Sequence, residues 1–279
     1  MLKSHIDLWL KEDVGFGDYS SRATIAPDQL GEARLLVKEQ GVLAGVEVAQ
    51  EIIRITDPEA SFERYKHDGD WVEPGDIAFK IVGRVINLLS TERLILNCMQ
   101  RMSGIATKTR FLQQKIAHTS ARLLDTRKTT PGFRMLEKQA VLIGGGLNHR
   151  HGLYDMIMLK DNHLDFCGGI ANAVTKTLNY MEAQKLDLKI EVEVRNLKEL
   201  NEVILFDRVD RIMLDNFTPE EISSCIKLIP DHFETEASGG INEENIVAYA
   251  ETGIQFISVG ALTHNVKSLD LSLKANLGQ

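Results

Sequence analysis

Disulfides, membrane spans and secretion signals are all missing from this sequence. The 279 residues include only three cysteines, Cys98, Cys167 and Cys225, which lie far apart and form no Cys-x-x-Cys pair. That spacing indicates reduced, incidental thiols rather than a disulfide framework or a zinc site. No stretch approaches the ~20 apolar residues of a membrane span, and the N-terminus carries charges throughout, without the apolar core of a signal peptide. We therefore expect a cytoplasmic protein with no membrane partner.

An excess of positive charge is also missing. The 32 Lys and Arg residues are outnumbered by 40 Asp and Glu residues, which gives a net charge of -8 at pH 7. An acidic protein is a poor candidate for binding nucleic acid, because phosphates attract surfaces rich in Lys and Arg. A local cluster of cations is therefore informative, since it runs against the average. The length allows one large domain or two smaller ones.

The N-terminal part of the chain mixes helix and strand signals. We expect a short amphipathic helix around Trp9, a loop over 12–21, a strand and then a helix over 33–49, and a turn feeding a strand over 68–83. Gly45 marks the start of the second helix. The 68–83 stretch is similar to the β-sandwich of lipoyl and biotinyl domains, but Lys80 lacks the flanking residues of a modifiable lysine. We interpret this stretch as structural.

A long helix is expected next, with Ser90 as its N-cap and Glu92 in its first turn. No Pro- or Ser-rich linker follows, so we place the change of domain inside this helix. The predicted domains are an α+β, sandwich-like N-terminal domain over 1–105, a catalytic barrel over 106–265 and a tail over 266–279 that packs near the N-terminal domain.

After residue 120 the pattern changes to repeated strand–helix units. Six short apolar runs end in polar or glycine residues, at 121–128, 155–163, 189–194, 210–216, 232–240 and 255–262. Helical patterns fill the gaps, for example over 171–185. Alternating strands and helices predict a parallel sheet. Because six units fall short of eight, we expect an open or irregular parallel α/β barrel.

Charged residues and glycines stand where these runs end. Barrel enzymes place their active-site groups at the C-terminal ends of the strands. The candidates are Arg127 and Lys128, Lys160, Glu193, Asp215, Ser238 with Gly239 and Gly240, and Gly260. One such charge is usually solvated, but four consecutive strands ending in charges indicate a site, because buried charges are costly unless paired or used.

The cations among these residues predict a substrate with several negative charges. Arginine offers a planar fork that matches carboxylate or phosphate, and lysine offers a compact charge. Arg150 adds to this set, whereas for Arg134 and Lys138 a structural ion-pair network with Glu137 and nearby acids is an open alternative. Glycines at 144–146, 239–240 and 260 fit the same prediction, since glycine lets backbone N–H groups approach a phosphate closely.

Glu193 and Asp215 are the expected partners of a magnesium ion. Mg²⁺ prefers oxygen ligands and often takes one or two carboxylates together with substrate phosphate. His149 and His151 stand one residue apart, but no third ligand follows at zinc spacing. We interpret His149 as a substrate contact and leave the role of His151 open.

Longer motifs make the pattern specific. They are Leu-Asp-Thr-Arg-Lys-Thr-Thr-Pro-Gly (124–132), Gly-Gly-Gly-Leu-Asn-His-Arg (144–150), Leu-Lys-Asp-Asn-His (159–163), Glu-Val-Glu-Val (191–194), Met-Leu-Asp-Asn-Phe (213–217), Ala-Ser-Gly-Gly-Ile (237–241) and Ser-Val-Gly-Ala-Leu-Thr-His (258–264). The N-terminal half adds Glu-Asp-Val-Gly-Phe-Gly-Asp (12–18), Thr-Glu-Arg-Leu-Ile-Leu-Asn (91–97) and Ser-Gly-Ile-Ala-Thr (103–107). Together they resemble the quinolinate phosphoribosyltransferases, in order and along nearly the whole chain.

The resemblance implies the type II phosphoribosyltransferase fold and a reaction. Quinolinate and phosphoribosyl pyrophosphate would give nicotinate mononucleotide, pyrophosphate and CO₂ in the de novo synthesis of NAD, with Mg²⁺ required. It also implies a homodimer, or an assembly of dimers, in which the N-terminal domain of one subunit covers the barrel site of the other.

The resemblance also implies roles for individual residues. Arg127, His149, Arg150 and Lys160 would contact quinolinate, Lys128 would lie between the two substrates, and Thr126 joins the substrate-binding set. Arg93 matches the arginine donated across the dimer. Glu193 and Asp215 would face the ribose and the metal, and Ser238, Gly239, Gly240, Gly260 and His264 would hold the 5′-phosphate. Whether Lys128 or Lys160 assists decarboxylation stays open.

Two alternatives compete with this interpretation. The first is a related enzyme or paralogue with another substrate, such as a nicotinate phosphoribosyltransferase or the paralogue associated with molybdate uptake. The sequence shows no clear departure at the positions expected to contact quinolinate, which argues against it. The second is a non-catalytic anion-binding or scaffold protein, and the intact acids and cations at the strand ends argue against that.

Overall fold

A computed structural model describes residues 2–276 and divides the chain into two compact units. The first comprises residues up to 110, 129–145 and those from 265 on, and the second comprises 111–128 and 146–264. The domain ranges expected from the sequence stay a prediction. Among residues 2–276, no helix combines the length and the apolar character needed to cross a bilayer.

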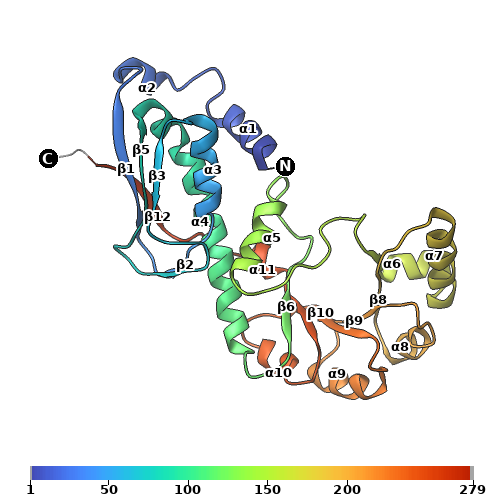
Figure 1. Cartoon of the computed structure of the whole chain (residues 1–279). Coiled ribbons are helices and arrows are strands. Elements are labelled where there is room, and N and C mark those ends of the chain that lie inside the picture. Colours follow the sequence, from blue (N-terminus) through green and yellow to red (C-terminus); the bar gives the residue numbers. More distant parts are fainter. Residues whose placement is uncertain (1, 277–279) are drawn as a thin grey trace. The chain divides into compact units, whose positions relative to one another are not determined.

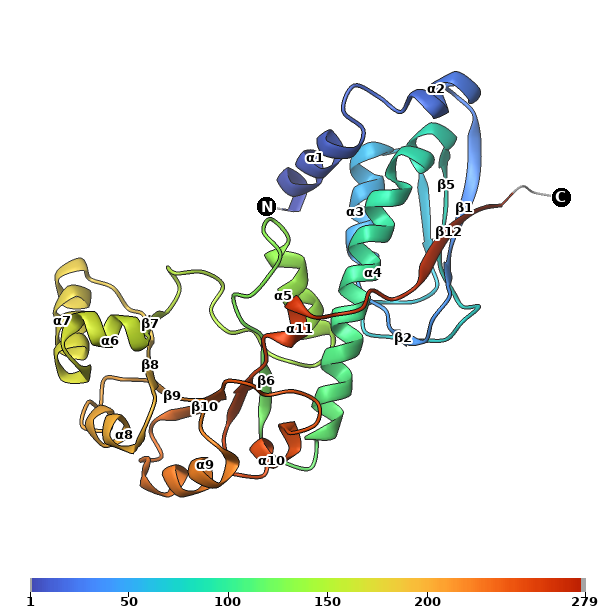
Figure 2. The ribbon, with the colours of Figure 1, turned by 180° about the vertical axis from the view of Figure 1, so that it is seen from behind.

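The first unit is built on a four-stranded antiparallel sheet. Its strand order is β12 (Leu271–Asn276), β1 (Leu30–Val37), β5 (Ile77–Arg84) and β3 (Ser61–Arg64), and β2 (Gly41–Val42) pairs separately with β4 (Trp71–Val72). In β1, Ala33, Leu35 and Val37 are buried in alternation, as expected for a strand with one face on the core. Figures 1 and 2 show α3 (Val46–Thr56) and the first part of α4 (Val85–Lys115) beside this sheet.

Helix boundaries in this unit confirm one prediction and correct two. Gly45 is the N-cap of α3, with a φ of 95° that suits glycine. The loop predicted over 12–21 is shorter, because α1 (Leu2–Asp13) and α2 (Tyr19–Thr24) take its two ends. Ser90 as an N-cap is wrong, since α4 begins directly after β5 and the Ser90 hydroxyl donates to the Ile86 carbonyl at 2.8 Å inside the helix. The unit also contains α5 (Arg134–Ile143).

The second unit contains the six parallel strands that the sequence predicts. They are β6 (Arg122–Leu124), β7 (Ile157–Leu159), β8 (Ile190–Val194), β9 (Arg211–Asp215), β10 (Glu234–Ser238) and β11 (Phe256–Ser258). The sheet order is β6-β11-β10-β9-β8-β7, so β6 and β7 are its two edges. This arrangement confirms the prediction of an open parallel α/β barrel.

Helices alternate with these strands. They are α6 (Asp161–Cys167), α7 (Ile170–Gln184), α8 (Leu197–Val203), α9 (Pro219–Cys225), the 3₁₀ helix Ile226–Leu228, α10 (Ile246–Ala250) and α11 (Ala261–His264). Helix α7 confirms the pattern expected over 171–185. Figure 1 shows α8, α9 and α10 along one side of the sheet.

Three neighbouring strands of the second unit, β8, β9 and β10, carry charged residues at every second or fourth position, with mostly apolar residues between them. In β8, Val192 and Val194 are fully buried and alternate with Glu191 and Glu193. The parallel register places Glu191 beside Arg211 and Arg211 beside Glu234. Since side chains two residues apart share a face of a strand, one face of the sheet is apolar and the other carries layers of polar groups. That polar face is where the site is built.

Candidate active site

A cavity of about 880 Å³ opens at the carboxyl ends of the parallel strands. It gathers nearly all the predicted site residues: Thr126, Arg127, Lys128, His149, Arg150, Lys160, Glu193, Asp215, Ser238, Gly239, Gly240, Gly260 and His264. Arg93 is the exception, because it is exposed on α4 in the first unit and does not line this cavity. Residues up to 138 positions apart in the sequence, such as Thr126 and His264, thus meet because parallel strands end at one edge of the sheet.

One part of the lining is cationic. Arg127 and Lys128 follow β6, Lys160 follows β7, and Arg150 is buried, with its Nη1 donating to the Met156 carbonyl at 3.2 Å. Burial lowers the pKa of Arg150, and repulsion from Arg127 lowers it further. Cations held this close repel one another until an anion binds between them, so the lining favours a ligand with several negative charges.

Two carboxylates stand at the ends of the neighbouring strands β8 and β9. Burial raises the pKa of Glu193, and the nearby Asp215 raises it further. Burial likewise raises the pKa of Asp215, although Asn216 Nδ2 donates to its Oδ2 at 2.6 Å and opposes the shift. The Nζ of Lys160 lies 3.7 Å from Glu193 Oε2. A divalent cation would relieve the crowding of the two acids, and their oxygen atoms are the ligands that Mg²⁺ prefers.

Backbone conformation brings two glycines close to the cavity. Gly239 has a φ of 98°, and a Cβ atom on it would lie 2.3 Å from Asn216 Oδ1. A Cβ atom on Gly260 would lie 3.0 Å from Lys128 Cδ and 3.2 Å from His264 Nε2. Only glycine fits both the conformation and the space at 239, which supports the prediction that backbone groups approach a ligand here.

Asp125 is a structural residue of the site that the sequence reasoning missed. It is fully buried after β6, and its carboxylate accepts the backbone N–H of His149 at 2.8 Å and Nδ2 of Asn148 at 2.6 Å. Backbone bonds join the same two segments, Leu147 N–H to the Leu123 carbonyl and Asp125 N–H to the Leu147 carbonyl. The loop that carries His149 and Arg150 is therefore fastened to the end of β6.

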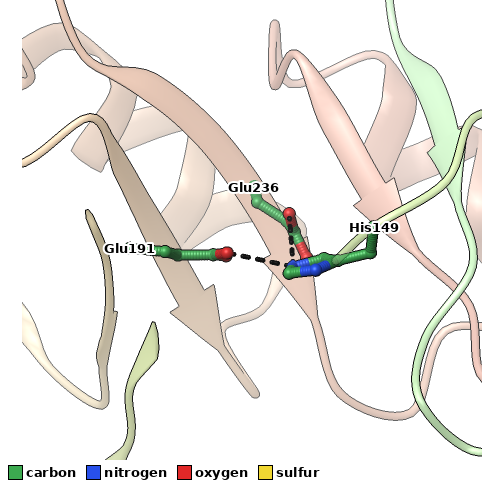
Figure 3. A group of neighbouring side chains, drawn as sticks. All are labelled: His149, Glu191 and Glu236. Atoms are coloured by element: carbon green, nitrogen blue, oxygen red, sulfur yellow. Dashed lines mark ion pairs between the residues drawn. The ribbon is translucent and has the colours of Figure 1, made fainter. Parts of the chain in front are cut away.

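Glu191 and Glu236 are a second pair that the sequence reasoning missed. Both are fully buried, and their carboxylates both face Nε2 of the buried His149 ring (Figure 3). One ligand atom of each of these three residues lies within 4.8 Å of the others, a spacing that a metal ion also allows. Arg211 Nη1 already lies 2.9 Å from Glu236 Oε2, which favours an ion-pair cluster. The alternation of Glu191 with Glu193 and of Glu234 with Glu236 was the signal available in the sequence.

Other residues considered from the sequence lie outside the cavity lining. Glu137 in the first unit is fully buried, 2.9 Å from Arg101 Nη2, and accepts the Thr130 N–H at 3.0 Å, as in a structural network. Arg134 Nε donates to Thr129 Oγ1 at 2.9 Å. Lys138 is buried. The backbone N–H of His151 donates to Asp155 at 2.6 Å. None of Arg134, Lys138 and His151 lines the cavity.

Comparisons with known proteins agree with this geometry along the whole chain. Residues 18–103 match the family profile "Quinolinate phosphoribosyl transferase, N-terminal domain", and residues 105–274 match "Quinolinate phosphoribosyl transferase, C-terminal domain". The chain belongs to the quinolinate phosphoribosyltransferase family. Family membership confirms the enzyme class that the motifs predict, a decarboxylating phosphoribosyltransferase of NAD biosynthesis.

Relatives of this family are similar over nearly the full length of this chain. The chloroplastic nicotinate-nucleotide pyrophosphorylase (carboxylating) of Arabidopsis thaliana is 45% identical over 98% of this chain and 82% of its own length. The probable enzyme of that name from Bacillus subtilis is 42% identical over 99% of this chain and 94% of its own length.

Solved structures confirm the type II phosphoribosyltransferase fold. NadC from Streptococcus pyogenes is 38% identical, covers 98% of this chain and 95% of its own, and superposes with a TM-score of 0.92. The nicotinate-nucleotide pyrophosphorylase of Francisella tularensis is 39% identical, covers 99% and 96%, and has a TM-score of 0.91.

Proposed function

We propose that the cavity binds quinolinate and phosphoribosyl pyrophosphate together and joins them with loss of CO₂. The observation that carries this proposal is the lining itself, in which Arg127, Lys128, Arg150 and Lys160 share one cavity with Glu193 and Asp215. Quinolinate is a dicarboxylate, and its co-substrate carries a phosphate and a pyrophosphate. Two such anions repel each other unless a dense set of cations holds them together.

The proposal divides the lining between the two substrates. Arg127, His149, Arg150 and Lys160, with Thr126, form the quinolinate side, and Lys128 stands between the substrates. Ser238, Gly239, Gly240, Gly260 and His264 form the side for the 5′-phosphate, which the close approach of the Gly239 and Gly260 backbone supports.

In the proposed reaction, the quinolinate nitrogen attacks C1 of the ribosyl group as the bond to pyrophosphate breaks and pyrophosphate takes the electron pair. Glu193 and Asp215 stabilise the positive charge that develops on the ribosyl centre. The carboxylate beside the ring nitrogen then leaves as CO₂. Its electron pair passes to the ring carbon next to the cationic nitrogen, and that carbon takes up a proton. Lys128 and Lys160 are the ammonium groups of the cavity available to assist this step.

Magnesium belongs to the proposal, and Glu193 and Asp215 would hold it. The fit rests on a buried and a half-buried carboxylate, Glu193 and Asp215, whose pKa values are raised by burial, so that a cation next to them lowers the free energy of the ionised pair. When bound, Mg²⁺ supplies positive charge for the departing pyrophosphate.

A homodimer, or an assembly of dimers, is also part of the proposal, with Arg93 of each subunit completing the site of the other. In support, Arg93 is exposed, as a side chain offered to another subunit would be. The cytoplasmic location and the absence of a nucleic-acid or membrane partner are kept as predictions.

The decisive experiment offers purified protein Mg²⁺, phosphoribosyl pyrophosphate and either quinolinate or nicotinate. We expect nicotinate mononucleotide, pyrophosphate and CO₂ from quinolinate alone. Turnover of nicotinate would mean that the quinolinate side of the cavity is assigned to the wrong substrate. Failure to release pyrophosphate with either acid would favour a non-catalytic anion-binding protein.

The roles of the two acids are tested in the same assay. Glu193→Ala and Asp215→Ala should each lower kcat on the order of 100-fold, because the charge they stabilise exists only in the transition state. Binding of quinolinate, measured by calorimetry, should change far less. A loss confined to binding, with kcat kept, would contradict the assignment.

A further inference from the structure

The floor of the cavity contains a buried histidine held by two buried acids. Nε2 of His149 lies 2.9 Å from Glu191 Oε2 and 3.6 Å from Glu236 Oε2. His149 is 8% exposed and lines the cavity, whereas both acids are fully buried and do not line it. Figure 3 shows both carboxylates directed at the same edge of the imidazole, Glu191 from β8 and Glu236 from β10.

The other side of the imidazole is also held. The backbone N–H of Arg150 donates to Nδ1 at 2.7 Å, and the backbone N–H of His149 itself donates to Asp125 at 2.8 Å. Because Nδ1 accepts a hydrogen bond, the ring proton lies on Nε2, which faces the two acids. Nδ1 thus accepts a hydrogen bond and Nε2 lies within ion-pair distance of both acids, so contacts on two sides restrict the orientation of the ring.

The acids are themselves fixed by a cation deeper in the barrel. Arg211 is buried, and its guanidinium lies 2.9 Å from Glu236 Oε2 and 2.7 Å from Glu234 Oε2. Oε1 of Glu234 also lies 2.9 Å from Lys189 Nζ. A chain of ion pairs therefore runs from Lys189 at the surface through Glu234 and Arg211 to Glu236, and from Glu236 to the His149 ring.

Two carboxylates beneath an anion-binding cavity need a reason, because they repel the ligand through a medium of low dielectric constant. Arg211 offsets part of that repulsion. The carboxylates of Glu191 and Glu236 do not line the cavity, and both lie against His149. We propose that Glu191 and Glu236 are positioning residues for quinolinate, acting through His149. They hold its ring, and with it the Arg150 peptide that bonds to the ring, in the orientation that the dicarboxylate requires.

This inference rests on the proposed role of His149 at the quinolinate side of the cavity. It predicts that the two acids affect one substrate only. Glu191→Gln and Glu236→Gln each replace one carboxylate oxygen with an amide NH2 group, with little change in volume. Each should raise the KM for quinolinate about tenfold and leave the KM for phosphoribosyl pyrophosphate and kcat within about twofold, because the groups act by orienting a binding residue.

Glu234→Gln is the matched control. It removes a carboxylate from the same Arg211 cluster, two residues before Glu236 on the same face of β10, but that carboxylate pairs with Arg211 and Lys189. We expect both KM values to stay at the wild-type level in this variant. If Glu234→Gln raises the KM for quinolinate as much as Glu236→Gln does, disturbance of the charge cluster explains the effect and the inference is wrong.

A double-mutant cycle separates this inference from the function on which it rests. His149→Ala should raise the KM for quinolinate, and adding Glu191→Gln to it should cause no further rise, because the acid acts through the ring. An unchanged KM in His149→Ala overturns the assignment of His149 to the quinolinate side. A raised KM in His149→Ala combined with wild-type values in both Gln variants overturns only the positioning role.

Glu191→Asp provides a milder variant should a Gln variant fail to fold. It keeps the charge but withdraws the carboxylate from Nε2 by one methylene, so the KM for quinolinate should still rise, by a few-fold, with the KM for phosphoribosyl pyrophosphate unchanged. Equal changes in both KM values in this variant would refute the positioning role.

Discussion

Asp125 organises the cavity without lining it. Its carboxylate holds the backbone of His149 and the side chain of Asn148, so two loops from different parts of the sequence end in a fixed relation. Asp125→Ala should raise the KM for quinolinate on the order of tenfold, because hydrogen bonds to a buried carboxylate are worth more than neutral ones. Steady-state kinetics with each substrate varied in turn checks this.

Asn148→Ala tests how much each of the two hydrogen bonds to Asp125 contributes to the KM. It removes the bond from the Asn148 side chain and keeps the bond from the His149 N–H. A smaller rise in the KM for quinolinate is expected than in Asp125→Ala. An equal or larger rise would show that the Asn148 side chain, and not the His149 backbone, is the important partner.

Glu236 makes stability depend on pH. Burial raises the pKa of Glu236 from the ordinary 4.5 to about 7, and the nearby Glu191 adds to the shift. The folded chain therefore binds this proton more tightly than the unfolded chain, and the contribution of Glu236 to stability falls as the pH rises from about 4.5 to 7. Glu236→Gln cannot titrate, so its stability relative to the wild type should improve across that window by at most about 3 kcal/mol.

Urea unfolding at pH 5, 6, 7 and 8 measures this difference. Glu234→Gln should show no such improvement, because bonds from Lys189 and Arg211 outweigh burial and lower the pKa of Glu234. Its carboxylate contributes stability above its ordinary pKa and loses it only as the pH falls below that value. Parallel pH profiles for the two variants would contradict the shift of Glu236.

Residue-level prediction from the sequence succeeded where a charge stands at a strand end and failed one layer deeper. Glu193 could be recognised because it ends β8, while Glu191 differs only by standing two residues earlier on the same face. Periodicity places both on that face but does not tell which side chain lines the cavity and which lies against a histidine. That distinction depends on the registers of β8, β9 and β10, which are set by long-range packing.

The turn after β10 depends on a single glycine. Gly239→Ala introduces a Cβ atom into the space of Asn216 at a φ of 98°, so we expect a loss of stability of about 1–2 kcal/mol. We also expect the KM for phosphoribosyl pyrophosphate to rise, on the order of tenfold, because the displaced backbone belongs to the phosphate side of the cavity.

Gly253→Ala is the control for strain alone. Gly253 has a φ of 91°, but a Cβ atom there would lie 3.9 Å from the nearest side chain, and Gly253 does not line the cavity. It should lose less stability than Gly239→Ala, because it adds strain without a clash, and neither KM should change. A normal KM for phosphoribosyl pyrophosphate in Gly239→Ala would remove this turn from the substrate site.

At the level of elements, the sequence predicted the strands of the barrel better than the boundaries of the N-terminal unit. The start of α4 was misplaced because Val85 and the following apolar residues continue the pattern of β5, with no cap residue between them. Strand β12 was not predicted, since Leu271 and Leu273 alternate over only six residues. Its partner β1 begins at Leu30, more than 200 residues earlier in the sequence, and no local sequence pattern reveals a pairing between strands so far apart.

The assembly of the whole molecule is open to a complementation test. If Arg93 completes the site of the other subunit, Arg93→Ala and Glu193→Ala inactivate a dimer in different places. Co-expression of the two variants gives mixed dimers with one intact site each. Because half of randomly formed dimers are mixed, activity should reach about a quarter of the wild-type value. Activity no greater than that of the separate variants would mean that Arg93 serves its own chain or none.

The pairing of β12 with β1 also has a consequence for synthesis on the ribosome. Strand β1 ends at Val37 and its partner begins at Leu271, so the N-terminal sheet cannot be completed until the last part of the chain has emerged. At typical translation rates that interval is on the order of 10 to 50 s. The strands of the barrel, from Arg122 to Ser258, are all made earlier. The unit that begins the chain is therefore the last to finish folding, and until then the edge of β1 is exposed to chaperones and to other nascent chains.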